Sequence, residues 1–209
     1  MAQSGADDVV IRTRGLSKQY PGGVTALSGL DLEVKRNSIF GFLGPNGAGK
    51  TTTIKLLLGL ARPTTGSATL FGFDSERDTL EVRRRIGYLA QDPRYYDYMT
   101  ARETLRFTAK FFFSGPDGEL EQHIRDTLEL VGLGDKADRA IKGFSGGERQ
   151  RLGIAQAQIS RPELLILDEP ARVARSHGPP RRARSDEPAP VAHDDLLFHP
   201  YPRGCSAGQ

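Results

Sequence analysis

Residues 44–51 constrain this chain more than any other segment. They read Gly-Pro-Asn-Gly-Ala-Gly-Lys-Thr and fit the pattern G-x-x-x-x-G-K-[ST] at every fixed position. The apolar run before them, residues 38–43, predicts a buried strand, and residues 51–58 predict a helix. A glycine-rich turn between a strand and a helix can direct backbone N–H groups at an anion, and the helix dipole adds to the attraction. The segment therefore predicts a phosphate-binding loop in an α/β fold.

The loop residues are expected to hold a nucleoside triphosphate. Lys50 would place its ammonium group on the β- and γ-phosphates, and the Thr51 hydroxyl would help to hold Mg²⁺. The alternative is a glycine-rich turn that fits the pattern by chance, which the flanking strand and helix argue against. The residues predicted to contact the nucleotide here are Gly44, Pro45, Asn46, Gly47, Ala48, Gly49, Lys50, Thr51 and Thr52.

Cysteine content and hydropathy indicate the compartment. The single cysteine, Cys205, excludes an internal disulfide and fits a reducing environment. No apolar stretch approaches the roughly 20 residues that cross a bilayer, and the first ten residues do not resemble a signal peptide. We expect a soluble, cytoplasmic protein.

The basic character of the chain lies mainly in its last part. Residues 171–209 hold six of the 29 basic and four of the 26 acidic residues, so residues 1–170 carry 23 and 22 and are almost neutral. The three arginines at positions 83–85 are interpreted as a solvated helix face, the alternative being a nucleic-acid patch. Nucleic acid is therefore not an expected partner.

The order of predicted elements describes strands followed by a helical region. Residues 9–14 and 30–34 predict antiparallel strands with a turn at residues 20–23 between them, and two short strands are expected further along. Two capping boxes, Thr100 with Glu103 and Ser145 with Glu148, predict helix starts. The remaining predicted elements are strands over residues 67–71 and 86–90 and helices over residues 101–113, 119–131 and 145–160.

A fully apolar run at residues 164–167 predicts a buried parallel strand that ends in acidic residues. A carboxylate at the C-terminal end of a strand beside a phosphate loop can hold Mg²⁺, so Asp168 is predicted as a metal residue. The next carboxylate, Glu169, is predicted to be the general base that activates the attacking water. An acidic turn after a buried strand is a weak signal alone and a strong one in combination with the loop.

The succession of predicted strands and helices ends after Pro170. Residues 171–209 contain six prolines and six arginines without a sustained period, and only residues 196–198 could pack. Such a composition does not bury enough apolar surface to offset the entropy of ordering. This tail is predicted to be disordered.

Together, these motifs resemble the nucleotide-binding subunit of ABC transporters, over residues 9–170. The run Ser145, Gly146, Gly147, Glu148 looks like the family's signature motif, which implies contact with the γ-phosphate of ATP held by a second subunit. The alternative is a plain helix cap, and Glu148 stands where many members carry Gln. The resemblance implies a P-loop NTPase core with a parallel sheet, N-terminal antiparallel strands and a helical signature subdomain at about residues 93–160, with ATP and Mg²⁺ as cofactors.

Two further positions match the family. Tyr20 lies 24 residues before Gly44 and resembles the aromatic residue that stacks on adenine, the alternative being an ordinary turn tyrosine. Gln91 follows a predicted short strand and resembles the glutamine that contacts Mg²⁺ and couples to the membrane partner, the alternative being a surface glutamine. The aromatic residues at 95, 96 and 98 fit a groove for a permease helix and core packing equally well.

The chain departs from the family after residue 170. A loop containing Leu-Asp, then a helix, a strand and a histidine, should follow, and residues 171–209 do not supply them. The tail histidines, His177, His193 and His199, have no apolar strand before them, so the family histidine is assigned to none. The strand at 164–167 is therefore expected to lack a neighbour. A reading-frame change after residue 170 is favoured over a genuine regulatory tail, leaving residues 1–170 as an incomplete ATP-binding domain.

The resemblance implies an ATPase subunit that powers a bacterial exporter of drugs, antibiotics or polysaccharides. It implies a membrane permease as partner, an ATP-dependent dimer with a second nucleotide-binding subunit, and a location at the inner face of the cell membrane. Hydrolysis by this chain is expected to be impaired. The alternatives are a non-hydrolysing ATP-binding remnant and a soluble ABC-type ATPase acting on ribosomes or DNA.

Overall fold

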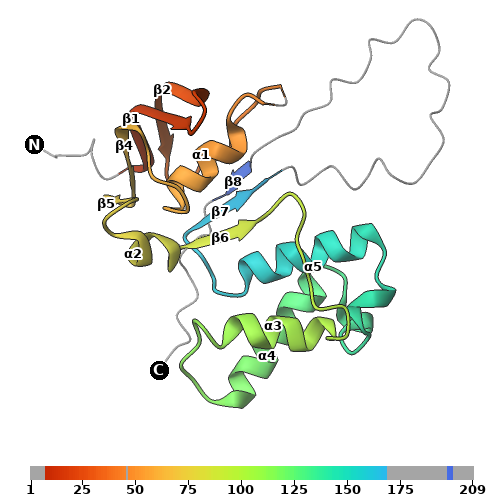
Figure 1. The fold of residues 1–209 in the computed structure, drawn as a ribbon. Coiled ribbons are helices and arrows are strands. Elements are labelled where there is room, and N and C mark those ends of the chain that lie inside the picture. Colours follow the sequence, from red (N-terminus) through yellow and green to blue (C-terminus); the bar gives the residue numbers. More distant parts are fainter. Residues whose placement is uncertain (1–7, 46, 169–196, 200–209) are drawn as a thin grey trace, which may run out of the picture. The chain divides into compact units, whose positions relative to one another are not determined.

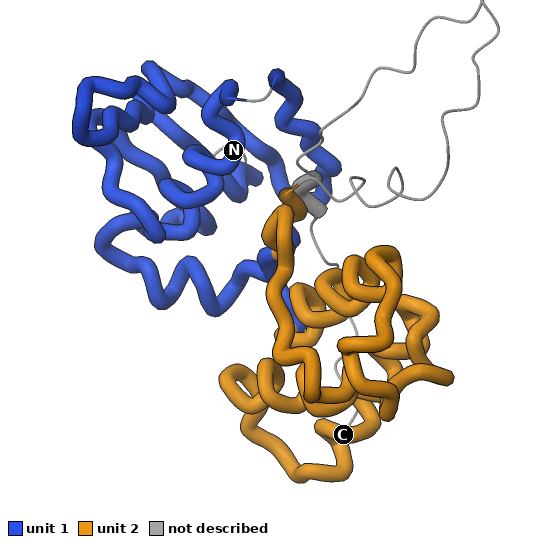
Figure 2. The backbone as a smooth tube through the Cα atoms, turned by 45° about the vertical axis from the view of Figure 1, so that its right-hand side comes forward, with its two compact units in different colours: residues 1–88, 161–166, 197–209 blue, residues 89–160, 167–196 orange. Residues whose placement is uncertain are grey.

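The computed structural model describes residues 8–45, 47–168 and 197–199, the last three as backbone only (Figure 1). The chain divides into two compact units, shown in different colours in Figure 2. The first comprises residues 1–88, 161–166 and 197–209, and the second comprises residues 89–160 and 167–196. Each unit has its own set of buried apolar side chains.

An antiparallel sheet forms one part of the first unit. Its strand order is β2–β1–β4–β5, and all three neighbouring pairs are antiparallel. The Gly23 N–H donates to the Tyr20 carbonyl (3.2 Å) and closes the β1–β2 turn. The predicted antiparallel strands are thus confirmed, and each is longer than its apolar alternation indicated. The bounds are β1 Val9–Tyr20, β2 Val24–Lys35, β4 Thr65–Leu70 and β5 Phe73–Asp74.

Helix α1, Lys50–Leu57, begins directly after the glycine-rich loop. It buries one face, including Ile54 and Leu57, and packs against β2 and β4. The guanidinium of Arg83, on the short helix α2 (Thr79–Arg83), donates to the carbonyls of Leu58 (2.8 Å) and Gly59 (3.0 Å). A cation at this position satisfies carbonyls at the end of α1 and complements its dipole.

The second sheet has the strand order β3–β8–β7–β6. Strand β7, Leu164–Leu167, lies where the sequence predicted it. The Leu164 N–H donates to the Arg85 carbonyl (3.2 Å) and the Asp168 N–H to the Leu89 carbonyl (2.9 Å). The constant offset between partners makes β7 parallel to β6, Ile86–Leu89. The polar residues that follow β6 and β7 therefore start at the same edge of the sheet.

The buried strand predicted at residues 38–43 is wrong in extent and burial. Strand β3 contains only Phe40–Gly41, and the flanking Ile39 and Leu43 are 69% and 60% exposed. Its pairing with β8 covers two residues. Residues beyond so short a strand pairing are not part of the sheet, and their side chains stay exposed. The prediction from the apolar run alone therefore overestimated how many of these residues are buried.

Strand β8, Leu197–His199, overturns the expectation that β7 lacks a neighbour. It comes from the tail and lies between β3 and β7. The expectation that no strand precedes His199 is also wrong, because His199 is the last residue of β8. The rest of the predicted disordered tail lies outside the described residues.

The direction of β8 determines where its histidine lies. Phe198 pairs with Phe40 and Leu197 with Gly41 in antiparallel register. His199 therefore lies beside the start of β3, whereas the glycine-rich loop follows the other end of β3. Although this strand is present, none of the tail histidines is matched to the family histidine.

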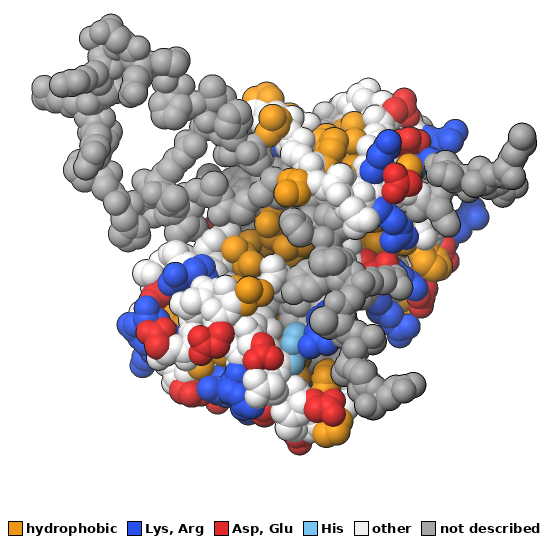
Figure 3. All heavy atoms as spheres, turned by 180° about the vertical axis from the view of Figure 1, so that it is seen from behind, with side chains coloured by type: hydrophobic (Ala, Val, Ile, Leu, Met, Phe, Trp, Pro, Cys, Tyr) orange, Lys and Arg blue, Asp and Glu red, His pale blue; other side chains and the backbone are white. Residues whose placement is uncertain are grey.

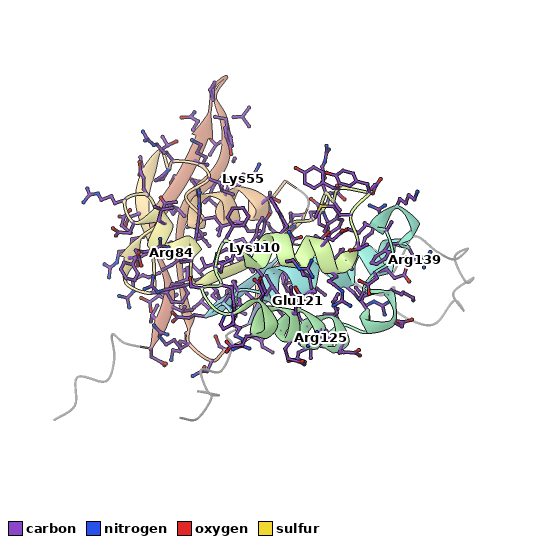
Figure 4. All side chains as sticks on the ribbon, turned by 90° about the horizontal axis from the view of Figure 1, so that it is seen from below. Lys55, Arg84, Lys110, Glu121, Arg125 and Arg139 are labelled. Carbon is purple, nitrogen blue, oxygen red and sulfur yellow. The ribbon has the colours of Figure 1, made fainter. Side chains whose placement is uncertain are left out.

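The second unit is built from helices that share one apolar core. Helices α3, α4 and α5 pack against one another, and the Arg106–Glu121 ion pair (2.6 Å) joins α3 to α4, with Glu121 labelled in Figure 4. Both predicted capping boxes are present. The bounds are α3 Ala101–Ala109, α4 Asp117–Leu130, η1 Gly134–Lys136, η2 Ile141–Gly143 and α5 Gly146–Gln158.

Charged side chains of both signs are interspersed over the face shown in Figure 3. The three arginines at 83–85 have partners within the chain. Arg83 donates to a carbonyl at the end of α1, and Arg84 and Arg85 donate to the Glu81 carboxylate. Within the described ranges, no helix is both long enough and apolar enough to span a bilayer.

Replacement of Phe198 by proline tests the insertion of β8. Proline removes a backbone N–H from a strand that has a neighbour on each side, so a ladder hydrogen bond is lost. We expect Phe198→Pro to lower the free energy of unfolding by about 2 kcal/mol, and Phe198→Val, which keeps the N–H, to lower it less. Urea denaturation followed by circular dichroism measures both. Equal stability of all three proteins would contradict the placement of β8.

Candidate nucleotide-binding site

The glycine-rich loop reaches α1 through two left-handed backbone conformations. Gly47 and Gly49 have φ values of 86° and 85°, which side-chain-bearing residues rarely adopt. A Cβ on Gly49 would lie 2.4 Å from the carbonyl oxygen of Ala26 in β2. Glycine at position 49 is thus required twice, for its conformation and for the close approach of β2.

Lys50 lies over this loop rather than in solvent. It is 7% exposed, and its ammonium group donates to the carbonyls of Gly44 (2.5 Å) and Pro45 (3.2 Å). The first turn of α1 contains no acidic residue, so no carboxylate there competes with an anion. A buried ammonium group, first-turn amides and left-handed glycines form a cradle that fits a phosphate chain.

The remaining loop residues lie around Lys50. Thr51 is exposed and Thr52 half-buried on the first turn of α1. The Ala48 N–H donates to the Pro45 carbonyl (3.0 Å) and keeps the loop compact. Asn46, which was predicted to contact the nucleotide, lies outside the described residues.

Tyr20 is the last residue of β1 and is half-buried. The ammonium group of Lys18 lies 5.1 Å from the centre of its ring and also donates to the Arg62 carbonyl (2.8 Å). A cation over an aromatic face is attracted by the ring quadrupole. Lys18 therefore helps to orient the ring that was predicted to stack on adenine.

Gln91 and Asp168, both predicted metal residues, are placed near one another by the backbone. The Asp168 N–H bonds the carbonyl of Leu89, two residues before Gln91 (2.9 Å). Asp168 is 2% exposed, and Gln91 is half-buried. Both belong to the second unit, whereas the loop belongs to the first. The predicted base, Glu169, lies outside the described residues.

The signature start is a capped helix N-terminus open to solvent. Ser145 is exposed, and a Cβ added to Gly147 would meet no described atom within 4 Å. The Glu148 carboxylate accepts from the Ser145 N–H (2.6 Å), and the Ser145 hydroxyl accepts from the Glu148 N–H (3.3 Å). Lys136 on η1 pairs with the second carboxylate oxygen of Glu148 (2.7 Å).

These contacts change the acidity of Glu148. The Lys136 ammonium group, followed by the Ser145 N–H, lowers the pKa of Glu148 from 4.5 to about 2. Stabilising the ionised form in this way favours a carboxylate that is charged at every physiological pH. Sequence analysis found Glu148 but missed Lys136, because no local pattern indicates a pairing between residues 12 positions apart on different elements.

Sequence analysis also missed the hydrogen bonds that join the segment after Gln91 to the signature helix. The Tyr95 hydroxyl donates to the Arg149 carbonyl (3.0 Å), and the Arg149 guanidinium pairs with Asp97 (2.8 Å). Burial raises the pKa of Tyr95, and a Cβ on Gly153 would lie 2.8 Å from its hydroxyl oxygen. Tyr95 thus packs against the helical core, whereas Tyr96 and Tyr98 are 61% and 77% exposed.

The sequence profile described as ABC transporter matches residues 27–172. The chain belongs to the ABC transporter family. It is 44% identical over 161 residues to the bacitracin transport ATP-binding protein BcrA of Bacillus licheniformis, covering 77% of this chain and 51% of that protein. It is 37% identical over 161 residues, with the same coverage, to the linearmycin resistance ATP-binding protein LnrL of Bacillus subtilis. The chain thus spans about half the length of these curated relatives.

Solved structures show the same fold. The cbiO1 protein of Clostridium perfringens, part of the ABC transporter complex cbiONQ, superposes with a TM-score of 0.69 at 26% identity, covering 78% of this chain and 66% of that one. A dimeric ATP-binding cassette bound to ADP and Pi gives a TM-score of 0.69 at 24% identity, covering 78% and 75%. The chain therefore has an ABC ATPase fold, with antiparallel N-terminal strands, a parallel sheet and a helical region.

The lowered pKa of Glu148 predicts a pH-dependent effect of Glu148→Gln. Because the folded-state pKa lies below the ordinary value of 4.5, the stability that ionisation contributes is present above about pH 4.5 and is lost as the pH falls toward 2. We expect Glu148→Gln to destabilise the chain more at pH 6 than at pH 3. Urea denaturation at the two pH values measures this, with Glu119→Gln, an exposed carboxylate on α4, as control. An equal loss at both pH values would contradict the ion pair.

Proposed function

We propose that this chain is the ATP-binding subunit of an ABC-type export complex. The observation that carries the proposal is the position of Lys50, buried over the loop of Gly44 and Pro45 at the start of α1. Within the described residues, this ammonium group donates to carbonyl oxygens of the loop, and a triphosphate offers it stronger, charged acceptors. On nucleotide binding, the ammonium group of Lys50 would exchange its bonds to the loop carbonyls for bonds to phosphate oxygens.

The other residues of the first unit complete the proposed binding. The loop N–H groups and the α1 dipole would hold the phosphates, and Tyr20 would stack on the adenine base. Thr51 would help to hold Mg²⁺, and within the second unit Gln91 and Asp168 stay proposed as Mg²⁺ residues. Magnesium, when bound, neutralises charge between the β- and γ-phosphates. Mg²⁺ at nucleotide sites is held largely by phosphate oxygens and water, with one or two protein oxygens.

The second proposed phosphate site is the signature start. Ser145, Gly146, Gly147 and Glu148 would meet the γ-phosphate of ATP on a second nucleotide-binding subunit, which makes dimerisation ATP-dependent. The open space at Gly147 supports the close approach of such a ligand. No site for nucleic acid is proposed.

Coupling to a membrane permease is the third element of the proposal. Tyr96 and Tyr98 are exposed on the segment after Gln91, with their ring centres 5.8 Å apart, and this surface is proposed to receive the permease. Two relatives are named for bacitracin transport and linearmycin resistance, which supports export of an antibiotic-like compound. The assembled complex would lie at the inner face of the cell membrane.

We propose that ATP hydrolysis needs catalytic groups in addition to those in residues 1–168. Glu169 would act as general base on the attacking water. Residues 171–209 contain no Leu-Asp pair, and their strand-borne histidine, His199, lies beside the start of β3, whereas the glycine-rich loop follows the other end of that strand. A non-hydrolysing ATP-binding protein is therefore the second candidate function. The proposed boundaries are an ATP-binding domain over 1–170, with its helical subdomain at about 93–160, and a tail over 171–209.

Replacement of Lys50 tests the proposed nucleotide site. Loss of a charge-assisted hydrogen bond to phosphate costs about 2 kcal/mol, so Lys50→Ala should weaken binding of trinitrophenyl-ATP with Mg²⁺ roughly thirtyfold. Fluorescence titration measures the affinity.

Lys55→Ala is the matched control, because Lys55 lies on the same helix with its side chain exposed (labelled in Figure 4). We expect it to bind like the unaltered chain. Thermal unfolding of both variants separates lost affinity from lost fold. Equal affinity of Lys50→Ala and the unaltered chain would refute the assignment of the loop.

A further inference from the structure

The signature start contains a negative charge of its own. Glu148 is the third residue of α5 and caps the helix through the Ser145 N–H. Its carboxylate lies at the same helix end at which a phosphate would bind. An uncompensated anion there strengthens the helix but repels a phosphate through like charge. A phosphate site at this helix start therefore requires a nearby cation.

Lys136 is that cation. Its ammonium group lies 2.7 Å from Glu148 Oε1, and the two side chains are 31% and 11% exposed. Two other cations of this region have different partners: Arg149 pairs with Asp97, and Arg139, labelled in Figure 4, donates to the Gly143 carbonyl. Of these three groups, Lys136 alone is paired with the Glu148 charge.

We propose that Lys136 is a positioning residue of the signature site, which neutralises Glu148 so that the capped helix start can accept the terminal phosphate of a nucleoside triphosphate. The inference rests on the proposed function of this helix start. Glu148 and Lys136 act as a unit, in which the carboxylate caps the helix and the ammonium group cancels its charge. A glutamine can fill the same place in a capping box without charge. A chain with glutamine at position 148 therefore has no need of the lysine.

This relation predicts the order of four variants in ATP-dependent association. Lys136→Met leaves the carboxylate unbalanced and should weaken dimerisation in the non-hydrolysable analogue AMP-PNP with Mg²⁺ by about tenfold. Lys136→Arg, which keeps the charge, should stay within about twofold, and Glu148→Gln should associate at least as well as the unaltered chain. The double variant Lys136→Met with Glu148→Gln should recover to within about threefold of the unaltered chain. Sedimentation velocity over a range of protein concentrations measures each.

The double variant separates charge compensation from a structural role. If Lys136 only supports η1, the double variant stays as weak as Lys136→Met, and that result overturns the inference. Titration with trinitrophenyl-ATP, which reports the loop of the first unit, should be unchanged in Lys136→Met and Lys136→Arg. If the unaltered chain binds this probe in a Lys50-dependent manner but does not associate, the inference is overturned and nucleotide binding stands. If the chain does not bind the probe, the proposed function itself fails.

Discussion

The approach of the Ala26 carbonyl to Gly49 fixes the phosphate loop in place. The space that a side chain at position 49 would fill is occupied by the backbone of β2, so the loop lies directly against the antiparallel sheet. The left-handed conformation of Gly49 then starts α1, and the next residue, Lys50, is turned back over Gly44 and Pro45. Helix α1 is held at its other end by Arg83. The position of the proposed triphosphate site depends on this one contact between backbones.

The two proposed phosphate sites solve the same electrostatic problem differently. The loop has a buried lysine and no acidic residue in the first turn of its helix. The signature helix has an acidic residue in its first turn, Glu148, and balances it with Lys136 from another element. In both cases a helix N-terminus supplies N–H groups and a favourable dipole. The difference lies in whether the cation is local in sequence, and that decides whether sequence analysis can find it.

Local patterns predicted the elements that local interactions determine. The capping boxes at Thr100 and Ser145 and the apolar strand β7 were predicted correctly, because side chain–backbone bonds three residues apart and continuous burial leave clear signals. The extent of β3 and the existence of β8 were not predicted, because both depend on a pairing between residues about 158 positions apart. The roles of Tyr95 and Lys136 likewise depend on partners that other elements supply.

Isothermal titration of the chain with Mg-ATP, Mg-ADP and AMP tests the central claim, that Lys50 and the loop bind the phosphates beyond the first. We expect ATP and ADP to bind, and AMP, which lacks the β-phosphate, to bind roughly thirtyfold or more weakly. Equal affinity for AMP and ATP would place the binding energy on the nucleoside and contradict the account.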